Sequence, residues 1–527
     1  MSKLGNEASY LLVQSLTKAE KRHFKLKHNP KGPLETPLFV QLFDAMDKMK
    51  TYEEKVLLGS FGKKQLPNLK RELYFHVLGC LRDLAEKKDV RLKIRQMIDY
   101  AQVLYNKGLY QQALKLLNRA KSKAIRCHEV ELKIQILEFE KVIEARHITR
   151  SIENRAEQLR DESHQSVRQL NRLSHLSNLA LSMYGQYIKK GHVRSREEAV
   201  ELKKYFEREA ADYNLIDTHE HTAEFSPSEQ LSFYEKINLY QAHSWYAYIL
   251  QDFPLYYRYV RKWVHLFEQE PQQKKIDAAL YLKAMNNLLT ALFFIGNGKE
   301  FDRTLAALEA YWEAHRHSAN ENTKTLAFVY LYTARFNKYF MEGTFDQGLY
   351  LIQEWEKELK RHQLQIDPYR ILVFYYKIAS LYFGSGENTL AIKYLNKIIN
   401  LKIGNLKADI QCFARILLLI THYELKHFDL LEYLLPSTMN FLEKNKEMSG
   451  IFIEIVKFLR RFDRLGLRGL PGAFIELKHT LTQVAQDPYE RRFLLYLDVI
   501  SWLESKIEGR PVQAVIHDKF MKRLPRI

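Results

Sequence analysis

Two glycine pairs have the spacing that comes closest to a known chemical motif. Gly296-Asn297-Gly298 and Gly384-Ser385-Gly386 match fragments of the loops that cradle phosphate groups with backbone amides. Neither continues to a third glycine or to Gly-Lys-Ser/Thr, and neither follows a predicted strand. Because both lie between apolar patterns of helical period, they predict tight turns between helices.

Histidine pairs are the next candidates, because alternate residues on a loop can bind a metal ion. His219-Glu220-His221 and His315-Arg316-His317 are the densest groups, yet no third ligand stands at a spacing typical of zinc sites. Cys80, Cys127 and Cys412 lie far apart and form no C-x-x-C pair, which is typical of a reducing compartment. With no local sign of a nucleophile and its base, we expect no metal, no cofactor and no enzyme activity.

Basic side chains gather at the two ends of the chain. The net charge is +18, and residues 1–100 carry 20 Lys or Arg against 12 Asp or Glu. A capping box at Thr17 and Glu20 opens a predicted basic helix that could bind phosphates. A solvated helix face is the simpler interpretation of the same pattern. The candidate basic patch consists of Lys18, Lys21, Arg22, Lys25, Lys63, Lys64, Lys70 and Arg71.

The elements that position these residues are predicted to be helices. Only 20 Gly and 13 Pro occur in 527 residues, each about half the usual share, which favours long helices with few turns. A hydrophobic content of 46% excludes global disorder. From about residue 92 onward, apolar residues recur with the helical period, and no stretch alternates with a period of two. The fold class is therefore predicted to be all-α.

A repeated junction joins neighbouring helical patterns. The segment 108–113 combines a glycine that ends one helix, an aromatic residue, and an alanine that lets the next helix approach closely. Segments 343–348 and 386–391 echo it. The small residues of such junctions fall at positions 113, 156, 199, 304, 348 and 391, so most gaps are 43 or 44 residues. A period of this length is typical of stacked helix pairs.

The best unit, residues 94–127, matches tetratricopeptide-repeat (TPR) consensus positions at Ala101, Gly108, Tyr110, Ala113 and Ala120. Over roughly residues 92–510 the chain resembles the TPR superfamily. The resemblance implies a right-handed α-solenoid of about nine or ten helix pairs with a small N-terminal helical domain. The period departs from the 34 residues of a TPR, and a HEAT-like solenoid is the second candidate fold.

The resemblance also implies a function, namely a non-enzymatic scaffold that binds a peptide or partner helix in a concave groove. Carrying TPR groove positions onto the best-matching units gives Arg95, Gln102, Asn106, Asn337 and Ser380. An aromatic cluster could also line a groove, although packing between helices explains it more simply. That cluster is Tyr246, Tyr248, Phe253, Tyr256, Tyr257 and Tyr259.

The expected organisation is a basic N-terminal helical domain or cap at 1–90, TPR-like repeats at 91–465 and a C-terminal helical cap at 466–527. An alternative function is a transcriptional or RNA-linked regulator that binds nucleic acid through residues 1–90 and senses a ligand through the repeats. The helical pattern at 36–87 would suit a helix-turn-helix-like module, although it lacks a diagnostic turn. The longest uncharged stretches, such as 284–298, are shorter than a membrane span. We therefore expect a cytoplasmic protein with no membrane partner.

Overall fold

The computed structural model describes residues 7–29, 36–86, 89–147, 154–211, 231–362, 366–401, 408–445, 449–461 and 466–523. Within these ranges every regular element is a helix and no strand occurs, which confirms the all-α fold class. The chain divides into two compact units, Met1–Leu170 and Asn171–Ile527. The division falls within α9 (Arg155–Lys190), a single helix of 36 residues.

Unit 1 begins with five helices around an apolar core. They are α1 (Ala8–Ser15), α2 (Lys18–His28), α3 (Leu38–Lys48), α4 (Glu54–Phe61) and α5 (Leu66–Glu86). Phe24, Phe43 and Leu73 are almost completely buried where α1, α2 and α3 pack on α5. The predicted capping box is present, since Thr17 and Glu20 bond reciprocally at the start of α2.

The second part of unit 1 contains α6 (Val90–Asn106), α7 (Tyr110–Arg126) and α8 (Val130–His147). Gly108 joins α6 to α7 with a φ of 75°, a left-handed conformation that favours glycine. Ala101 and Ala113 are fully buried, because their small side chains let α6 and α7 pack closely together. The junction predicted at 108–113 is therefore confirmed.

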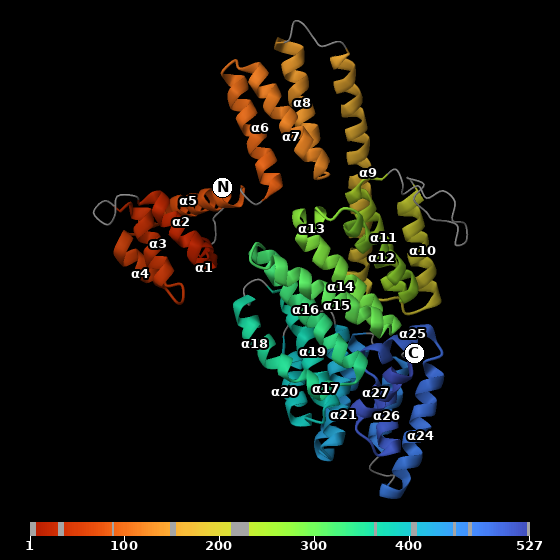
Figure 1. Cartoon of the computed structure of the whole chain (residues 1–527). Helices are drawn as coiled ribbons and strands as arrows, with labels where there is room; N and C mark the ends of the chain where they lie inside the picture. The colour runs from red at the N-terminus through yellow and green to blue at the C-terminus, as the bar shows by residue number, and fades with distance from the viewer. Residues whose placement is uncertain are drawn as a thin grey trace. The chain divides into compact units, whose positions relative to one another are not determined.

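Unit 2 follows as a longer series of helices (Figure 1). Successive helices pack on one another, so that α12 lies on α11, α14 on α12, α16 on α14, and α19 on α16. The bounds are α10 (Arg196–Ala211), α11 (Phe233–Leu250), α12 (Phe253–Gln269), α13 (Gln273–Ile276), α14 (Ala278–Ile295), α15 (Gly298–His315), α16 (Glu321–Glu342), α17 (Phe345–Gly348), α18 (Tyr350–His362), α19 (Pro368–Gly384), α20 (Asn388–Ile399), α21 (Ala408–Glu424), α22 (Phe428–Lys444), α23 (Gly450–Arg461), α24 (Gly466–Val484), α25 (Pro488–Tyr496), α26 (Val499–Glu508) and α27 (Val512–Arg523).

The two glycine pairs that match phosphate-loop fragments form turns between helices, as predicted. Gly296 ends α14 with a φ of 74°, and Gly386 lies between α19 and α20 with a φ of 87°. The other glycine of each pair lies where a neighbouring side chain packs closely against the backbone. A Cβ on Gly298 would lie 2.7 Å from the ring of Phe520, and a Cβ on Gly384 would overlap the ring of Phe345.

One helix, α14, is long and apolar enough to cross a membrane by length and composition, with a mean hydropathy of 1.4. In unit 2 it lies against α12, α15 and α16. One of its faces is buried, including Leu282, Met285 and Leu289. Its apolar composition therefore has an explanation in the packing of unit 2.

The segment between positions 156 and 199 is dominated by one long helix, α9. Positions 156 and 199 lie in the first turn of α9 and within α10, and the 36 residues of α9 run without a break between them. A helix of this length replaces the two shorter helices that the spacing predicts for this segment. This long helix also contains the point where the two compact units divide.

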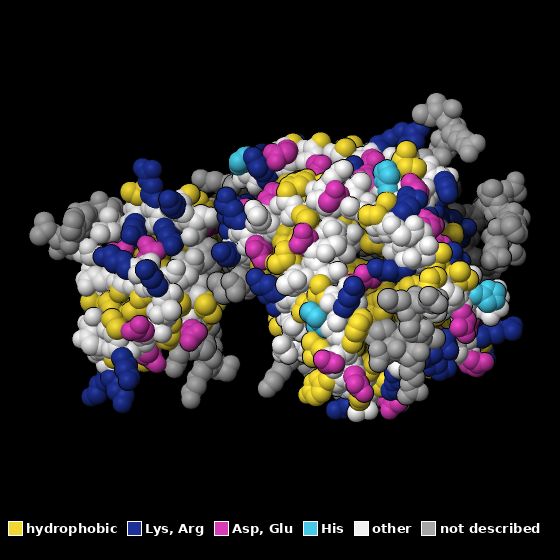
Figure 2. All heavy atoms as spheres, turned by 90° about the horizontal axis from the view of Figure 1, so that it is seen from below, with side chains coloured by type: hydrophobic (Ala, Val, Ile, Leu, Met, Phe, Trp, Pro, Cys, Tyr) yellow, Lys and Arg dark blue, Asp and Glu magenta, His cyan; other side chains and the backbone are white. Residues whose placement is uncertain are grey.

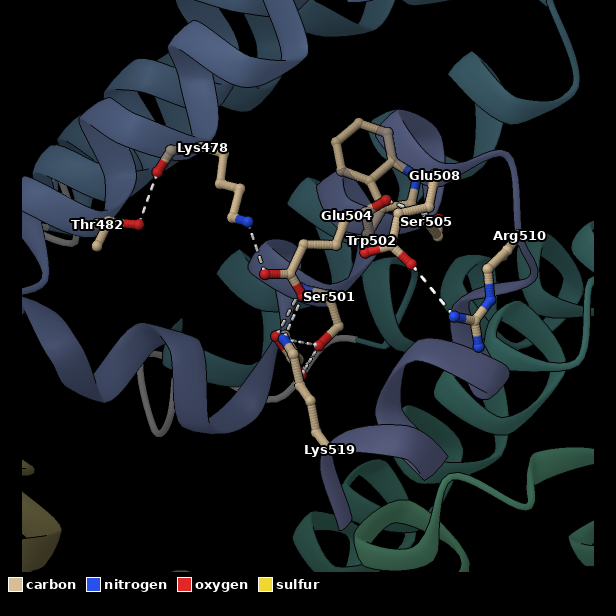
Figure 3. A network of polar contacts seen from close by, with 10 residues as sticks. Lys478, Thr482, Ser501, Trp502, Glu504, Ser505, Glu508, Arg510 and Lys519 are labelled. Atoms are coloured by element: carbon tan, nitrogen blue, oxygen red, sulfur yellow. Dashed lines mark hydrogen bonds and ion pairs between the residues drawn. The ribbon is translucent and has the colours of Figure 1, made fainter. Parts of the chain in front are cut away.

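The last helices of unit 2 return to an earlier part of the chain. His517 Nδ1 of α27 lies 2.7 Å from the carbonyl oxygen of Glu342, at the end of α16. Around α26, Glu504 forms ion pairs with Lys478 at 2.8 Å and Lys519 at 2.5 Å, joining α24, α26 and α27 (Figure 3). Residues 466–527 thus contact α16, and the predicted division into three segments stays a prediction.

Candidate functional site

A cavity of about 890 Å³ opens in unit 2 between α9, α11, α12, α14, α16 and the start of α19. We call it the groove. Its polar side chains recur at helical spacing, since residues three, four and seven apart share one face of a helix. On α11 these residues are Asn238, Gln241, Trp245 and Tyr248. On α14 they are Lys283, Asn286, Asn287 and Thr290.

The packing of α14 fixes the orientation of this polar stripe. Leu282, Met285 and Leu289 on its other faces are buried among α12, α15 and α16. Rotating α14 would expose these side chains, at about 1.5–3 kcal/mol for each. Asn286 and Asn287 are therefore held at the groove, where both are half-buried.

One part of the groove is aromatic. The rings of Tyr184 and Trp245 lie 5.0 Å apart, and those of Tyr187 and Trp245 are stacked at 5.3 Å. Beside them Leu181 of α9 is 66% exposed, which is unusual for a leucine that lines a cavity. This wall offers apolar contact to a ligand.

Two cations lie in another part of the groove. Lys283 Nζ donates a hydrogen bond to Gln241 Oε1 at 3.0 Å and lies 5.8 Å from the ring centroid of Trp263. The guanidinium of Arg370 lies 6.0 Å from the ring centroid of Tyr330. Burial lowers the pKa of Lys283, and the charge of Arg370 lowers it further. In the part of the chain that the structure describes, neither cation forms an ion pair with a carboxylate.

Trp263 lies beside the groove with its indole N–H buried. The side chain is fully buried, and its Nε1 has no hydrogen-bond acceptor among the described residues. Leaving a buried donor without a partner costs about 1–3 kcal/mol.

Asp367 is the carboxylate at the edge of the groove. Its Oδ1 accepts a hydrogen bond from the backbone amide of Tyr369 at 3.0 Å, and so caps α19 as the Asp-Pro sequence predicts. Because Asp367 is exposed and occupied by this cap, it does not neutralise the two cations.

The groove residues predicted from the TPR resemblance lie elsewhere. Arg95, Gln102 and Asn106 are exposed on α6 in unit 1, and Gln102 donates to Asn106 at 2.9 Å. Asn337 is buried and accepts from Lys377 Nζ at 2.5 Å. Ser380 donates to the carbonyl oxygen of Tyr376 at 2.9 Å. None of the five lines the groove of 890 Å³, and any role of these residues in binding stays a prediction.

The residues that do line the groove had a signal in the sequence. Asn238 and Gln241 on α11 are three residues apart, and Asn286 and Asn287 on α14 lie three and four residues after Lys283, so each set of polar residues shares one helix face. The aromatic cluster divides between two roles. Tyr248 and Tyr256 line the groove, whereas Tyr259 is buried and stacks on His243 at 4.1 Å.

The basic patch of unit 1 is partly neutralised by neighbouring carboxylates. Lys21 pairs with Asp47 at 2.6 Å, Lys25 with Asp44 at 2.6 Å, and Lys70 with Glu54 at 2.8 Å. Figure 2 shows Lys and Arg side chains interspersed with Asp and Glu on the face it presents. Binding of nucleic acid stays a prediction that depends on the exposed Lys18, Arg22, Lys63, Lys64 and Arg71.

The histidine candidates divide between described and undescribed segments. His219-Glu220-His221 lies outside the described residues. His315 Nδ1 lies 2.8 Å from the carbonyl oxygen of Tyr311, and its ring stacks on that tyrosine. No group of three His, Cys, Asp or Glu side chains is placed to hold a metal ion within the described ranges. Cys80, Cys127 and Cys412 are buried, and no disulfide joins them.

Comparisons with family models, with curated proteins and with solved structures find no match to this chain. The function of the groove must therefore be inferred from its own residues.

Proposed function

We propose that the protein is a non-enzymatic interaction scaffold that binds a peptide or partner helix in the groove of unit 2. The observation that carries this proposal is the pair of amide stripes on α11 and α14 beside an aromatic wall. An amide side chain both donates and accepts, so it can bond the N–H and C=O groups of a peptide whatever its sequence. The aromatic wall would take an apolar side chain of the same ligand.

The proposed architecture is a TPR-like right-handed α-solenoid of about nine or ten helix pairs. Glycines with positive φ at Gly108, Gly296, Gly343 and Gly386 support it, because each joins consecutive helices at a junction the repeat predicts. The helices α11, α14, α16 and α19, which line the groove, would be the first members of successive pairs. Stacked hairpins present such helices on an extended concave surface.

The lining favours binding over catalysis. Among the described residues that line the groove, Asp367 is the only carboxylate, and no histidine or cysteine is present. General acid–base or nucleophilic chemistry uses such groups in contact with one another. Three buried cysteines without a disulfide are consistent with the proposed cytoplasmic location.

The test is affinity selection with the full-length chain and a mixture of random heptapeptides. Peptides that co-elute with the protein are identified by mass spectrometry. The double variant Asn286→Leu/Asn287→Leu should lower retention by about thirtyfold, because two hydrogen bonds of about 1 kcal/mol each are lost. The matched control is Gln102→Leu/Asn106→Leu on α6, which should retain peptides like the unmodified protein. Absence of retention by the unmodified protein, or equal loss in both variants, would contradict the proposal.

A further inference from the structure

We infer that the groove recognises a carboxylate of its peptide, held between Lys283 of α14 and Arg370 of α19. The inference rests on the proposed peptide-binding function, and it names the charged group that the peptide must carry. Both side chains line the same cavity, and both are half-buried.

The first argument is the charge balance of this part of unit 2. Nearby cations on α16 are matched, since Arg335 pairs with Glu309 at 2.8 Å and Lys338 with Asp302 at 2.8 Å. Among the described residues, Lys283 is bonded only to the neutral oxygen of Gln241, and Arg370 faces the ring of Tyr330. Both half-buried charges line one cavity and disfavour each other, and an anion between them would be favourable.

The second argument is the geometry of the donors. A carboxylate has two oxygens and can accept about four hydrogen bonds. Lys283 and Arg370 together offer more donors than Gln241 and Tyr330 can use.

The third argument is that the carboxylate must come from outside the chain. Asp367 lines the groove, yet it is exposed and caps α19 through the amide of Tyr369. No ion pair in the described part of the chain joins Asp367 to either cation. An entering carboxylate would turn the repulsion between Lys283 and Arg370 into attraction to a shared partner, and it would form charge-assisted bonds.

The carboxylate could be the C-terminus of the peptide or an Asp or Glu side chain, and the experiment distinguishes the two. Four heptapeptide mixtures are offered to the full-length protein. Two end in a free acid and two in an amide, and one of each contains Asn and Gln in place of Asp and Glu. The retained amounts are compared by mass spectrometry.

At least one source of carboxylate should raise retention about tenfold, the effect of about 1.4 kcal/mol. Lys283→Met and Arg370→Gln should each remove that preference, while Lys283→Arg keeps it. The control is Lys262→Met, because Lys262 is exposed on α12 and does not line the groove. Circular dichroism and urea denaturation establish that each variant is folded.

Three results would overturn the inference. Equal retention of all four mixtures would show that the groove does not recognise a carboxylate, and it would leave the proposed peptide binding intact. A preference for acids that survives in both Lys283→Met and Arg370→Gln would place the carboxylate elsewhere. Retention of no mixture would overturn the inference together with the proposed function.

Discussion

Basic side chains in unit 1 and in the groove of unit 2 differ in whether a carboxylate lies beside them. In unit 1, buried Lys121 lies 2.7 Å from Glu140 and 3.2 Å from Glu162, and Glu140 also takes Arg155 at 3.3 Å. In the groove, Lys283 bonds to the side-chain amide of Gln241, its only hydrogen-bond partner among the described residues, and the cation Arg370 lies nearby. A cation already matched by a carboxylate contributes to structure, whereas an unmatched one is available to a ligand. Net charge alone does not distinguish the two.

The largest effect is expected when a carboxylate that matches buried cations in unit 1 is removed. Glu140→Gln removes the carboxylate that is completely buried between Lys121 and Arg155. Breaking a buried ion pair from one side leaves an uncompensated charge, so the free energy of unfolding of unit 1 should fall by about 3–5 kcal/mol. Urea denaturation followed by circular dichroism measures it.

The matched control is Glu138→Gln, whose carboxylate is 57% exposed and pairs with Lys141 at 2.6 Å. Exposed pairs contribute about 0–1 kcal/mol, so this variant should remain close to the unmodified protein. Equal changes in the free energy of unfolding for the two substitutions would show that burial does not determine how much an ion pair contributes to stability.

Lys377 in unit 2 gives the next largest effect, with the opposite sign. Its ammonium is half-buried against Asn337 and Phe340, and burial lowers its pKa to about 8. Because the folded pKa lies below the unfolded one, holding this charge destabilises the fold at pH 7, and stability rises from about pH 8 upward. Lys377→Met should raise the free energy of unfolding at pH 7 by about 1–2 kcal/mol, after the hydrogen bond to Asn337 is lost.

The same variant should also flatten the pH dependence of stability between about pH 8 and 9.5, which denaturation across a pH series would show. A lower stability at pH 7, with the slope unchanged, would mean that Lys377 is stabilised by its surroundings.

A smaller change in stability is expected at Lys283, together with a clear change in binding. Lys283→Met removes a charge that has no carboxylate partner in the described structure, so the free energy of unfolding should change by less than about 1 kcal/mol or increase. Retention of acidic peptides should fall about tenfold. A large loss of stability would show that Lys283 belongs with the structural cations of unit 1.

The smallest effect is expected at the basic patch. Lys25 and Asp44 are 45% and 41% exposed, so Lys25→Met should change stability by less than about 1 kcal/mol. Because Lys25 is already paired, the salt concentration that elutes the protein from heparin should also stay the same. A clear drop in that concentration would favour the alternative of nucleic-acid binding through residues 1–90.

Local rules explain why much of the fold could be predicted from the sequence. Thr17 and Gly108 act through neighbours within a few residues, and each has the predicted role. The groove could not be predicted in the same way. The groove forms between helices far apart in the chain, from α9 to α19, and such contacts are not visible in local sequence patterns. Asn337 bonds to Lys377 in the structure, and its role in binding stays a prediction.

The ion pairs could not be predicted from the sequence for a related reason. Lys121 and Glu162 are separated by 41 residues, and only the packed structure shows that they meet. The contrast between matched and unmatched cations therefore appears only when distances are known.

Hydrogen–deuterium exchange of the full-length protein, with and without the peptides it retains, tests the central claim most directly. The account predicts slower exchange in 233–250, 278–295 and 368–384, the helices that carry the amide stripes and the two cations. Exchange in α6, over 90–106, should not change. Protection confined to α6, or to the basic patch of unit 1, would contradict the claim that the groove of unit 2 is the binding site.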